Sequence, residues 1–158
     1  MSSTKVPDHL ELQFFTKRIM TQGRTVQKFM DLLEANPIFT PTKYGEDGPT
    51  KLKYTRDAFL EAFPMRNLLF RHTAPIYDII LPSGQGRMDG FFFHFEPTQH
   101  EHVTEFYELS VKIAELLEPL FGTVQSDWIR EDSPEIMAYR RPAGLTNPQF
   151  ATDRKSVV

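Results

Sequence analysis

The sequence predicts a single α+β domain in which helices pack on one face of a mainly antiparallel sheet of about four to five strands. Three strand-like segments follow one another between residues 67 and 95, with no helix between them. A long amphipathic helix and a further strand come next. The 158 residues, 40% of them hydrophobic, are enough for one buried core. A split β-α-β arrangement is the simplest that fits this order.

The first two predicted elements are a strand and a helix. Residues 9–16 alternate polar residues with the apolar Leu10, Leu12 and Phe14, which is typical of a half-buried strand. Thr25 is placed to cap the helix that follows. Its apolar positions recur with the helical period at Val26, Phe29, Met30 and Leu33. Asn36-Pro37 ends it, since a residue before proline is pushed out of the α region.

A long loop is predicted over residues 37–54, where prolines and glycines are frequent. Loops of this length within a compact domain are usually functional or mobile. Thr55 is then placed to cap a short helix that ends at Pro64. The inward positions of that helix are Ala58, Phe59, Ala62 and Phe63.

The middle of the chain predicts three strands, over residues 67–72, 76–81 and 88–95. Ser83-Gly-Gln-Gly86 is predicted to be the turn between the second and the third. The third strand carries four phenylalanines around His94, so one of its faces is expected in the core.

The long helix is predicted to begin with a capping box, in which Thr98 and Glu101 each satisfy a free backbone amide. Pro119 and Gly122 close it, and a returning strand is expected over residues 123–128. Beyond Glu131 the prolines predict irregular chain. The inward face of the helix is formed by Val103, Phe106, Tyr107, Ser110, Ile113, Ala114 and Leu117.

The composition argues against several classes of function. The chain has no cysteine, which removes disulfides, thiolate metal sites and cysteine nucleophiles. It has no apolar run of about 18 residues and no apolar segment near its N-terminus, so no membrane span and no secretory signal are predicted. A net charge of −3 argues against nucleic-acid binding. We therefore expect a cytoplasmic protein that needs no cofactor, and its oligomeric state stays open.

The C-terminal hexapeptide, residues 153–158, breaks with the composition before it. Asp-Arg-Lys-Ser-Val-Val is the peptide that a common sequencing adapter spells when it is translated. We therefore expect residues 1–152 to form the domain, with its natural C-terminus cut off, and residues 153–158 to be a non-native tail. The alternative is a natural C-terminus without fixed structure.

One group of residues could carry chemistry. His94 and Glu96 share a strand face, and His100, Glu101 and His102 lie at the start of the long helix. Imidazoles and carboxylates at such a corner could hold a divalent ion, which would make the chain a small metal-dependent enzyme using His94, Glu96 and His100. However, the spacing matches no known zinc pattern. We favour a His94 satisfied within the sheet, with His100 and His102 solvated, and we expect no catalytic residues.

A second group could carry binding. Basic and aromatic residues are interleaved within and just after the long loop, a mixture that contacts acidic partners through charge and stacking. The predicted binding residues are Lys43, Tyr44, Lys51, Lys53 and Tyr54. The alternative is a solvated loop that its own tyrosines pack.

Several of these residues also carry a resemblance. Pro41-Thr-Lys-Tyr-Gly45, Phe70-Arg71 and Phe121-Gly-Thr-Val124 are similar to segments of small α+β immunity proteins encoded beside bacterial toxins, of the immunity-protein-52-like kind. The likeness spans residues 39–126 and includes Lys51, Tyr54, Pro75 and Tyr77. It implies a non-enzymatic protein that binds a cognate toxin and occludes it. The chain departs from that pattern in having few acidic clusters, and an uncharacterised structural role is the remaining alternative.

Overall fold

The computed structural model describes residues 6–17, 20, 24–46, 51–82, 89–126, 136–140 and 149–153. Within them, nine strands form one sheet in the order β3-β2-β4-β5-β6-β1-β7-β8-β9, and every neighbouring pair is antiparallel. The strands are β1 (Leu10–Thr16), β2 (Lys43–Gly45), β3 (Lys51–Lys53), β4 (Leu68–Arg71), β5 (Ile76–Ile80), β6 (Asp89–Glu96), β7 (Phe121–Ser126), β8 (Ile136–Arg140) and β9 (Gln149–Asp153).

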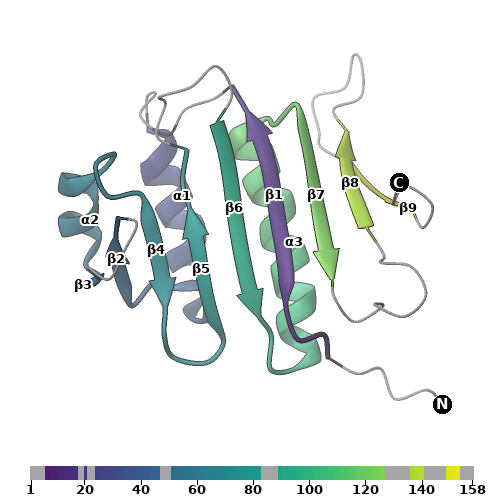
Figure 1. Cartoon of the computed structure of the whole chain (residues 1–158), viewed down its shortest axis with the longest axis horizontal. Coiled ribbons are helices and arrows are strands. Elements are labelled where there is room, and N and C mark those ends of the chain that lie inside the picture. The colour runs from purple at the N-terminus through teal and green to yellow at the C-terminus, as the bar shows by residue number, and fades with distance from the viewer. Residues whose placement is uncertain are drawn as a thin grey trace.

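The helices in the described ranges are α1 (Thr25–Glu34), α2 (Arg56–Ala62) and α3 (His100–Leu117), with a 3-10 turn η1 (Pro37–Phe39) after α1. Helices α1 and α3 lie side by side against one face of the sheet, and α2 lies at the end that bears β2 and β3 (Figure 1). The predicted α+β class, with an antiparallel sheet and helices on one face, is confirmed. Among the described residues, no helix has the length and apolar character needed to cross a membrane.

The predicted split β-α-β arrangement is present at the centre of the sheet. Strand β1 lies between β6 and β7 and is antiparallel to both, so β6 and β7 run parallel with β1 inserted between them. Helix α3 connects β6 to β7. The Thr16 hydroxyl donates a 2.7 Å hydrogen bond to the Leu117 carbonyl, which ties the end of β1 to the end of α3.

The predicted number of strands was wrong. The expected loop over residues 37–54 contains η1 and the β2–β3 hairpin, and the expected irregular chain after Glu131 contains β8 and β9. Strands of three residues that lie among prolines and glycines show too little alternation to be recognised. The predicted turn at Ser83–Gly86 and residues 154–158 of the tail lie outside the described ranges.

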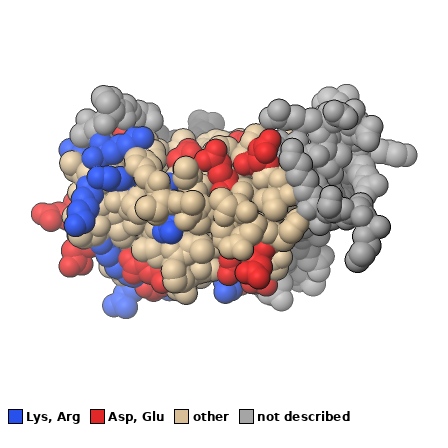
Figure 2. All heavy atoms as spheres, turned by 90° about the horizontal axis from the view of Figure 1, so that it is seen from below, with Lys and Arg blue, Asp and Glu red and all other residues tan. Residues whose placement is uncertain are grey.

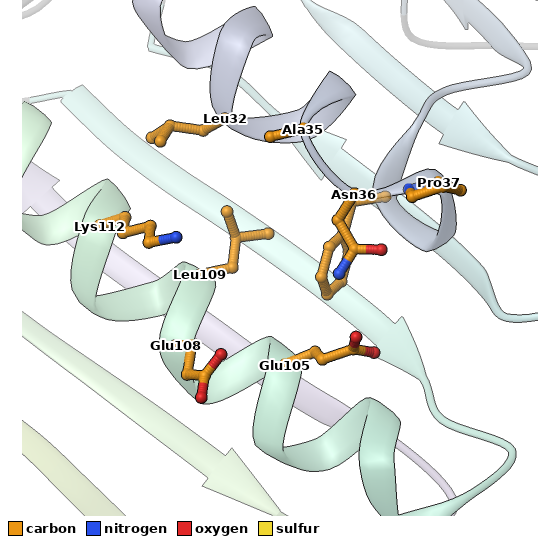
Figure 3. A pocket seen from close by; sticks show the side chains of 9 residues that line it. Leu32, Ala35, Asn36, Pro37, Glu105, Glu108, Leu109 and Lys112 are labelled. Atoms are coloured by element: carbon orange, nitrogen blue, oxygen red, sulfur yellow. The ribbon is translucent and has the colours of Figure 1, made fainter.

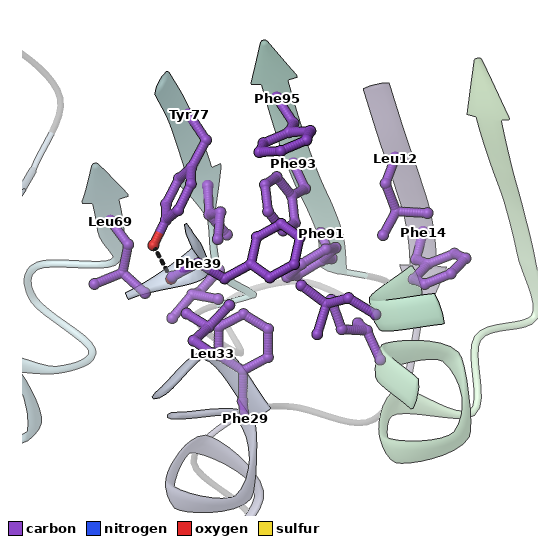
Figure 4. Packing of buried hydrophobic residues seen from close by; sticks show 14 of the residues in the cluster. Leu12, Phe14, Phe29, Leu33, Phe39, Leu69, Tyr77, Phe91, Phe93 and Phe95 are labelled. Atoms are coloured by element: carbon purple, nitrogen blue, oxygen red, sulfur yellow. Dashed lines mark hydrogen bonds between the residues drawn. The ribbon is translucent and has the colours of Figure 1, made fainter. Parts of the chain in front are cut away.

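The core lies between the sheet and the helices α1 and α3. Alternation along β6 turns Phe91, Phe93 and Phe95 toward the helices, and all three are fully buried. Phe29 and Leu33 of α1 and Phe39 of η1 meet this row from the other side (Figure 4). Aromatic side chains of β6, α1 and η1 therefore meet at the centre of the core.

Two of the three predicted helix caps were wrong. Thr55 does cap α2, since its hydroxyl accepts a 3.2 Å hydrogen bond from the Ala58 amide. Thr25 is instead the first residue of α1, and the residue before it makes no side-chain cap. The capping box at α3 is absent because the helix starts one residue later than expected, with Gln99 at its N-cap.

The His102 imidazole contacts the polar groups at the start of α3, where the capping box was expected. The Thr98 amide donates to His102 Nδ1 at 3.1 Å, and the Gln99 side-chain nitrogen lies 3.1 Å from His102 Nε2. The His102 side chain is 5% exposed and packs against the ring of Phe95. The prediction of a solvated His102 was therefore wrong, because this residue belongs to the buried stripe of the helix.

Candidate binding face

The face of the sheet that is turned away from α1 and α3 is called the open face here (Figure 1). Cross-strand pairing defines one row of side chains across it, from the β3 end to β7. The row consists of Lys53, Lys43, Phe70, Asp78, His94, Glu11 and Gln125. The neighbouring row consists of Lys51, Gly45, Leu68, Ile80, Phe92, Gln13 and Thr123.

Three of the five predicted binding residues come together on this face. Lys43 lies opposite Lys53 on the hairpin, and Lys51 lies opposite Gly45, so the three ammonium groups share one side. The Lys51 ammonium lies 4.6 Å from the centre of the Phe70 ring, which is a cation–π arrangement. Lys51 and Lys53 are exposed, and Lys43 is half-buried. The structure therefore supports a basic patch at one end of the open face.

The two predicted tyrosines lie elsewhere. Tyr44 is 6% exposed, faces the core and packs its ring against Phe59 at 5.9 Å. The Tyr54 hydroxyl donates a 2.8 Å hydrogen bond to Glu34 of α1. Burial, and then the hydrogen bond to Glu34, raise the pKa of Tyr54 above its usual value. Both tyrosines thus hold the hairpin in place and are not displayed beside the lysines.

The hairpin is fixed at its end by a polar network with α1. The Arg56 guanidinium forms ion pairs with Asp31 at 2.8 Å and with Glu34 at 3.0 Å, and it donates to the Gln27 carbonyl at 3.0 Å. Tyr54 and Arg56 share the carboxylate of Glu34. This network ties the chain that directly follows β3 to α1.

Replacing Arg56 by alanine is expected to lower the free energy of unfolding by about 1 kcal/mol, because it removes two partly exposed ion pairs. Urea denaturation followed by circular dichroism measures the change. Lys28→Ala is the control, since the Lys28 side chain is exposed on α1 and forms no ion pair with another described residue. Equal losses for the two variants would contradict the anchoring role of Arg56.

Side chains of β4 and β5 hold the segment before β2 in place. The Arg71 guanidinium donates to the Thr40 carbonyl at 2.9 Å, and the buried Tyr77 hydroxyl donates to the Phe39 carbonyl. Burial raises the pKa of Tyr77 well above its usual value. Arg71 and Tyr77, which belong to the resemblance described above, therefore act in this chain by positioning η1 and the start of the hairpin.

The open face also carries large apolar side chains that the sequence reading missed. Ile76, Ile80 and Phe121 are 44%, 37% and 49% exposed. Phe15 packs edge-on against Phe92 at 6.2 Å and stacks on Phe121 at 6.4 Å. All five lie in the outward phase of their strands, where an antiparallel sheet that faces water usually places polar residues. Apolar residues at these outward positions were the sequence signal that could have revealed the exposed patch.

The middle of the face is acidic and contains histidine. His94 Nδ1 lies 3.4 Å from Asp78 Oδ1, and the rings of His94 and His9 are 5.0 Å apart. Glu11 lies opposite His94 on β1, and Glu96 follows two residues after His94 on the same face. Figure 2, which looks along the strands and not onto the open face, shows Lys and Arg gathered toward the end that bears α2 and the hairpin, with Asp and Glu both at that end and along the middle.

The structure does not assemble the metal site that was considered as an alternative. His94 and Glu96 lie on the open face, whereas His102 lies in the core on the opposite side of the sheet. His100 is exposed at the first residue of α3. Among the described residues, no three histidines or carboxylates are grouped so that they could hold an ion.

A cleft of about 330 Å³ lies on the helix side, between the end of α1 and the middle of α3 (Figure 3). Its volume is at the lower end of the range for ligand sites. Leu109 and Leu32 form its apolar part, and Glu105 and Lys112 lie on either side of Leu109 along α3 (Figure 3). The lining is completed by Ala35, Asn36, Pro37, Phe39 and Glu108.

Comparison with known proteins gives little beyond this geometry. No protein-family model matches the chain, and no curated protein matches it. Among solved structures it is similar to the Pseudomonas aeruginosa T6SS protein PA0821, with a TM-score of 0.48 and 16% sequence identity. The match covers 74% of this chain and 41% of that chain, so the chain spans less than half of that protein. At this level the likeness says nothing about the chemistry of the open face.

Proposed function

We propose that this chain is a non-enzymatic cytoplasmic protein that binds a protein partner through the open face of its sheet. The observation that carries the proposal is the set of large apolar side chains, Ile76, Ile80 and Phe121, exposed on that face. Exposed apolar surface with a polar surround is typical of protein interaction sites. The hairpin lysines add charge beside it and favour a partner that presents carboxylates next to an apolar patch.

An immunity protein is the specific form of this function that we propose. The sequence resemblance of residues 39–126 to immunity proteins supports it, and so do the apolar side chains exposed on the open face. Such a protein needs no cofactor and no catalytic group. It acts by covering the toxin's site, so its affinity depends on the few side chains at the centre of the contact.

Co-expression with the product of the neighbouring gene tests this function. The chain is expected to restore growth to bacteria that produce that protein and to form a complex with it that survives purification. Failure of both, for the products of the genes on either side, would overturn the proposal.

Ile80→Glu is expected to weaken the complex at least about tenfold, because it places a charge in the apolar centre of the contact. Calorimetric titration of the purified partner measures the affinity. Met65→Glu is the matched control: Met65 is 78% exposed but lies after α2 and outside the sheet. Equal affinities for the two variants would place the contact elsewhere on the molecule.

A further inference from the structure

The charges on the open face are sorted by strand. Lys43, Lys51 and Lys53, on β2 and β3, form what we call the lysine column. Phe70, Ile76 and Ile80 follow on β4 and β5. Asp78 lies on β5 between Ile76 and Ile80, and beyond it come Glu96 on β6 and Glu11 on β1, which we call the acidic column. A basic edge, an apolar band and an acidic band thus lie side by side.

This order of bands allows the open face of one copy to match the open face of a second copy. Consider a second copy laid face to face on the first and related to it by a two-fold axis that runs along the strands between β4 and β5. Because such an axis reverses the order of the strands, β3 of one copy lies over β1 of the other, and β2 lies over β6. Lys53 then lies over Glu11, and Lys43 lies over His94, two residues along β6 from Glu96, so each lysine column meets an acidic column. The side chains of β4 and β5 meet in the middle, where Phe70 lies over Asp78. Two-fold contacts of this kind are the commonest in protein oligomers.

We propose that a second copy of this chain occupies the open face and that the chain forms a two-fold dimer by packing sheet on sheet. Aligned sheets pack with their strands within about 30° of each other, which keeps oppositely charged columns together even though single side-chain pairs shift. The occupant is the chain itself because its lysine and acidic columns provide the matching charges for each other.

The expected dimer is small and reversible. Six strands spaced at about 4.8 Å span about 29 Å, and five residues along a strand span about 17 Å. The contact therefore buries roughly 500 Å² on each copy, or about 1,000 Å² in total, which lies in the range of weak, transient complexes. Self-association would cover the exposed isoleucines until a partner competes for them, an inference that rests on the proposed function using the same face.

Charge reversal tests the dimer with the purified full chain alone. Analytical ultracentrifugation over a concentration series is expected to show a reversible monomer–dimer equilibrium. Lys43→Glu/Lys53→Glu and, separately, Glu11→Lys/Glu96→Lys are each expected to weaken dimerisation at least tenfold, because like charges then face each other. An equimolar mixture of the two variants is expected to restore the dimer, since opposite charges face each other again at both ends.

The control reverses the same amount of charge on the helix side, with Lys28→Glu/Lys112→Glu on α1 and α3, and should leave dimerisation unchanged. Circular dichroism shows whether each variant is folded. If one double variant does not fold, the single variants Lys53→Glu and Glu11→Lys are mixed instead. A wild-type chain that stays monomeric up to millimolar concentration would overturn the dimer, as would a mixture that stays monomeric.

The two proposals fail separately. A monomeric chain that still binds the neighbouring gene product would refute the dimer alone. A dimer that responds to charge reversal as expected, but that binds no such partner, would refute the proposed function alone.

Discussion

Replacing Phe93 by alanine is expected to lower the free energy of unfolding by about 3–5 kcal/mol, a large part of the stability of a domain of this size. The Phe93 side chain is fully buried. Its ring lies 5.1 Å from that of Phe106 on α3, 5.2 Å from that of Tyr77 on β5 and 6.1 Å from that of Phe39 on η1. The truncation opens a cavity where sheet and helices meet, and rigid aromatic neighbours close such a cavity poorly.

Urea denaturation measures this loss as a fall in the transition midpoint. Phe121→Ala is the control, since it removes the same ring from a side chain that is 49% exposed. That variant is expected to lose at most about 1 kcal/mol, because most of the removed surface was already in water. Similar losses for the two variants would mean that the phenylalanine row of β6 is not the centre of the core.

Replacing Gly122 by alanine is expected to destabilise the fold by about 1–3 kcal/mol, because the added methyl group enters a filled core. A Cβ atom built on Gly122 would lie 2.0 Å from Phe14 Cδ1 and 3.0 Å from the Gln13 carbonyl oxygen. Phe14 is fully buried, so its ring has no free space into which it can turn. Backbone entropy alone would predict the opposite sign, a gain of about 0.4–1 kcal/mol.

Gly90 offers a matched comparison on the other side of β1. A Cβ atom there would lie 2.5 Å from Phe92 Cε2, but Phe92 is half-buried on the open face and its ring can swing outward. Gly90→Ala is therefore expected to change stability by less than about 0.5 kcal/mol. Thermal denaturation of both variants decides the point, and a more stable Gly122→Ala protein would contradict the tight packing of β7 on β1.

The long elements could be predicted from sequence because burial imposes a period on them. Leu10, Leu12 and Phe14 of β1, and Phe91, Phe93 and Phe95 of β6, alternate because each strand has one face in the core. The short strands β2 and β3 escaped prediction because three residues are too few to show a repeated alternation. Strand β2 exists because it pairs with β4, which lies well apart from it in the chain, and β3 because it pairs with β2.

His102 shows how a polar residue can belong to the core. Its spacing to Phe106, Leu109 and Ile113 follows the helical period, so position alone indicated burial. Residue type argued the other way, and the buried imidazole is accommodated because Thr98 and Gln99 lie within hydrogen-bond distance of its two nitrogens. A helix position inside an apolar stripe is thus better evidence than the polarity of the residue that occupies it.

The predicted binding residues lie on two different faces of the sheet, again because position decides which side chains are buried. Lys43 and Tyr44 are neighbours in sequence, and a strand sends neighbours to opposite faces, so one is on the open face and the other is buried. The aromatic and basic composition of the segment was visible, but the face of each side chain depends on a hairpin that the composition does not encode. The exposed isoleucines of β5 were not recognised from sequence because they alternate with residues that are buried.

The place of β1 in the middle of the sheet has a consequence for how the chain is made. During synthesis the first strand leaves the ribosome long before β6 and β7, the two strands that flank it, exist. Until residue 126 is available, one edge of β1 has no partner, and its apolar face has no α3 to cover it. Strand β1 therefore needs protection from aggregation while α3, β6 and β7 are being made, and it joins the two halves of the finished sheet.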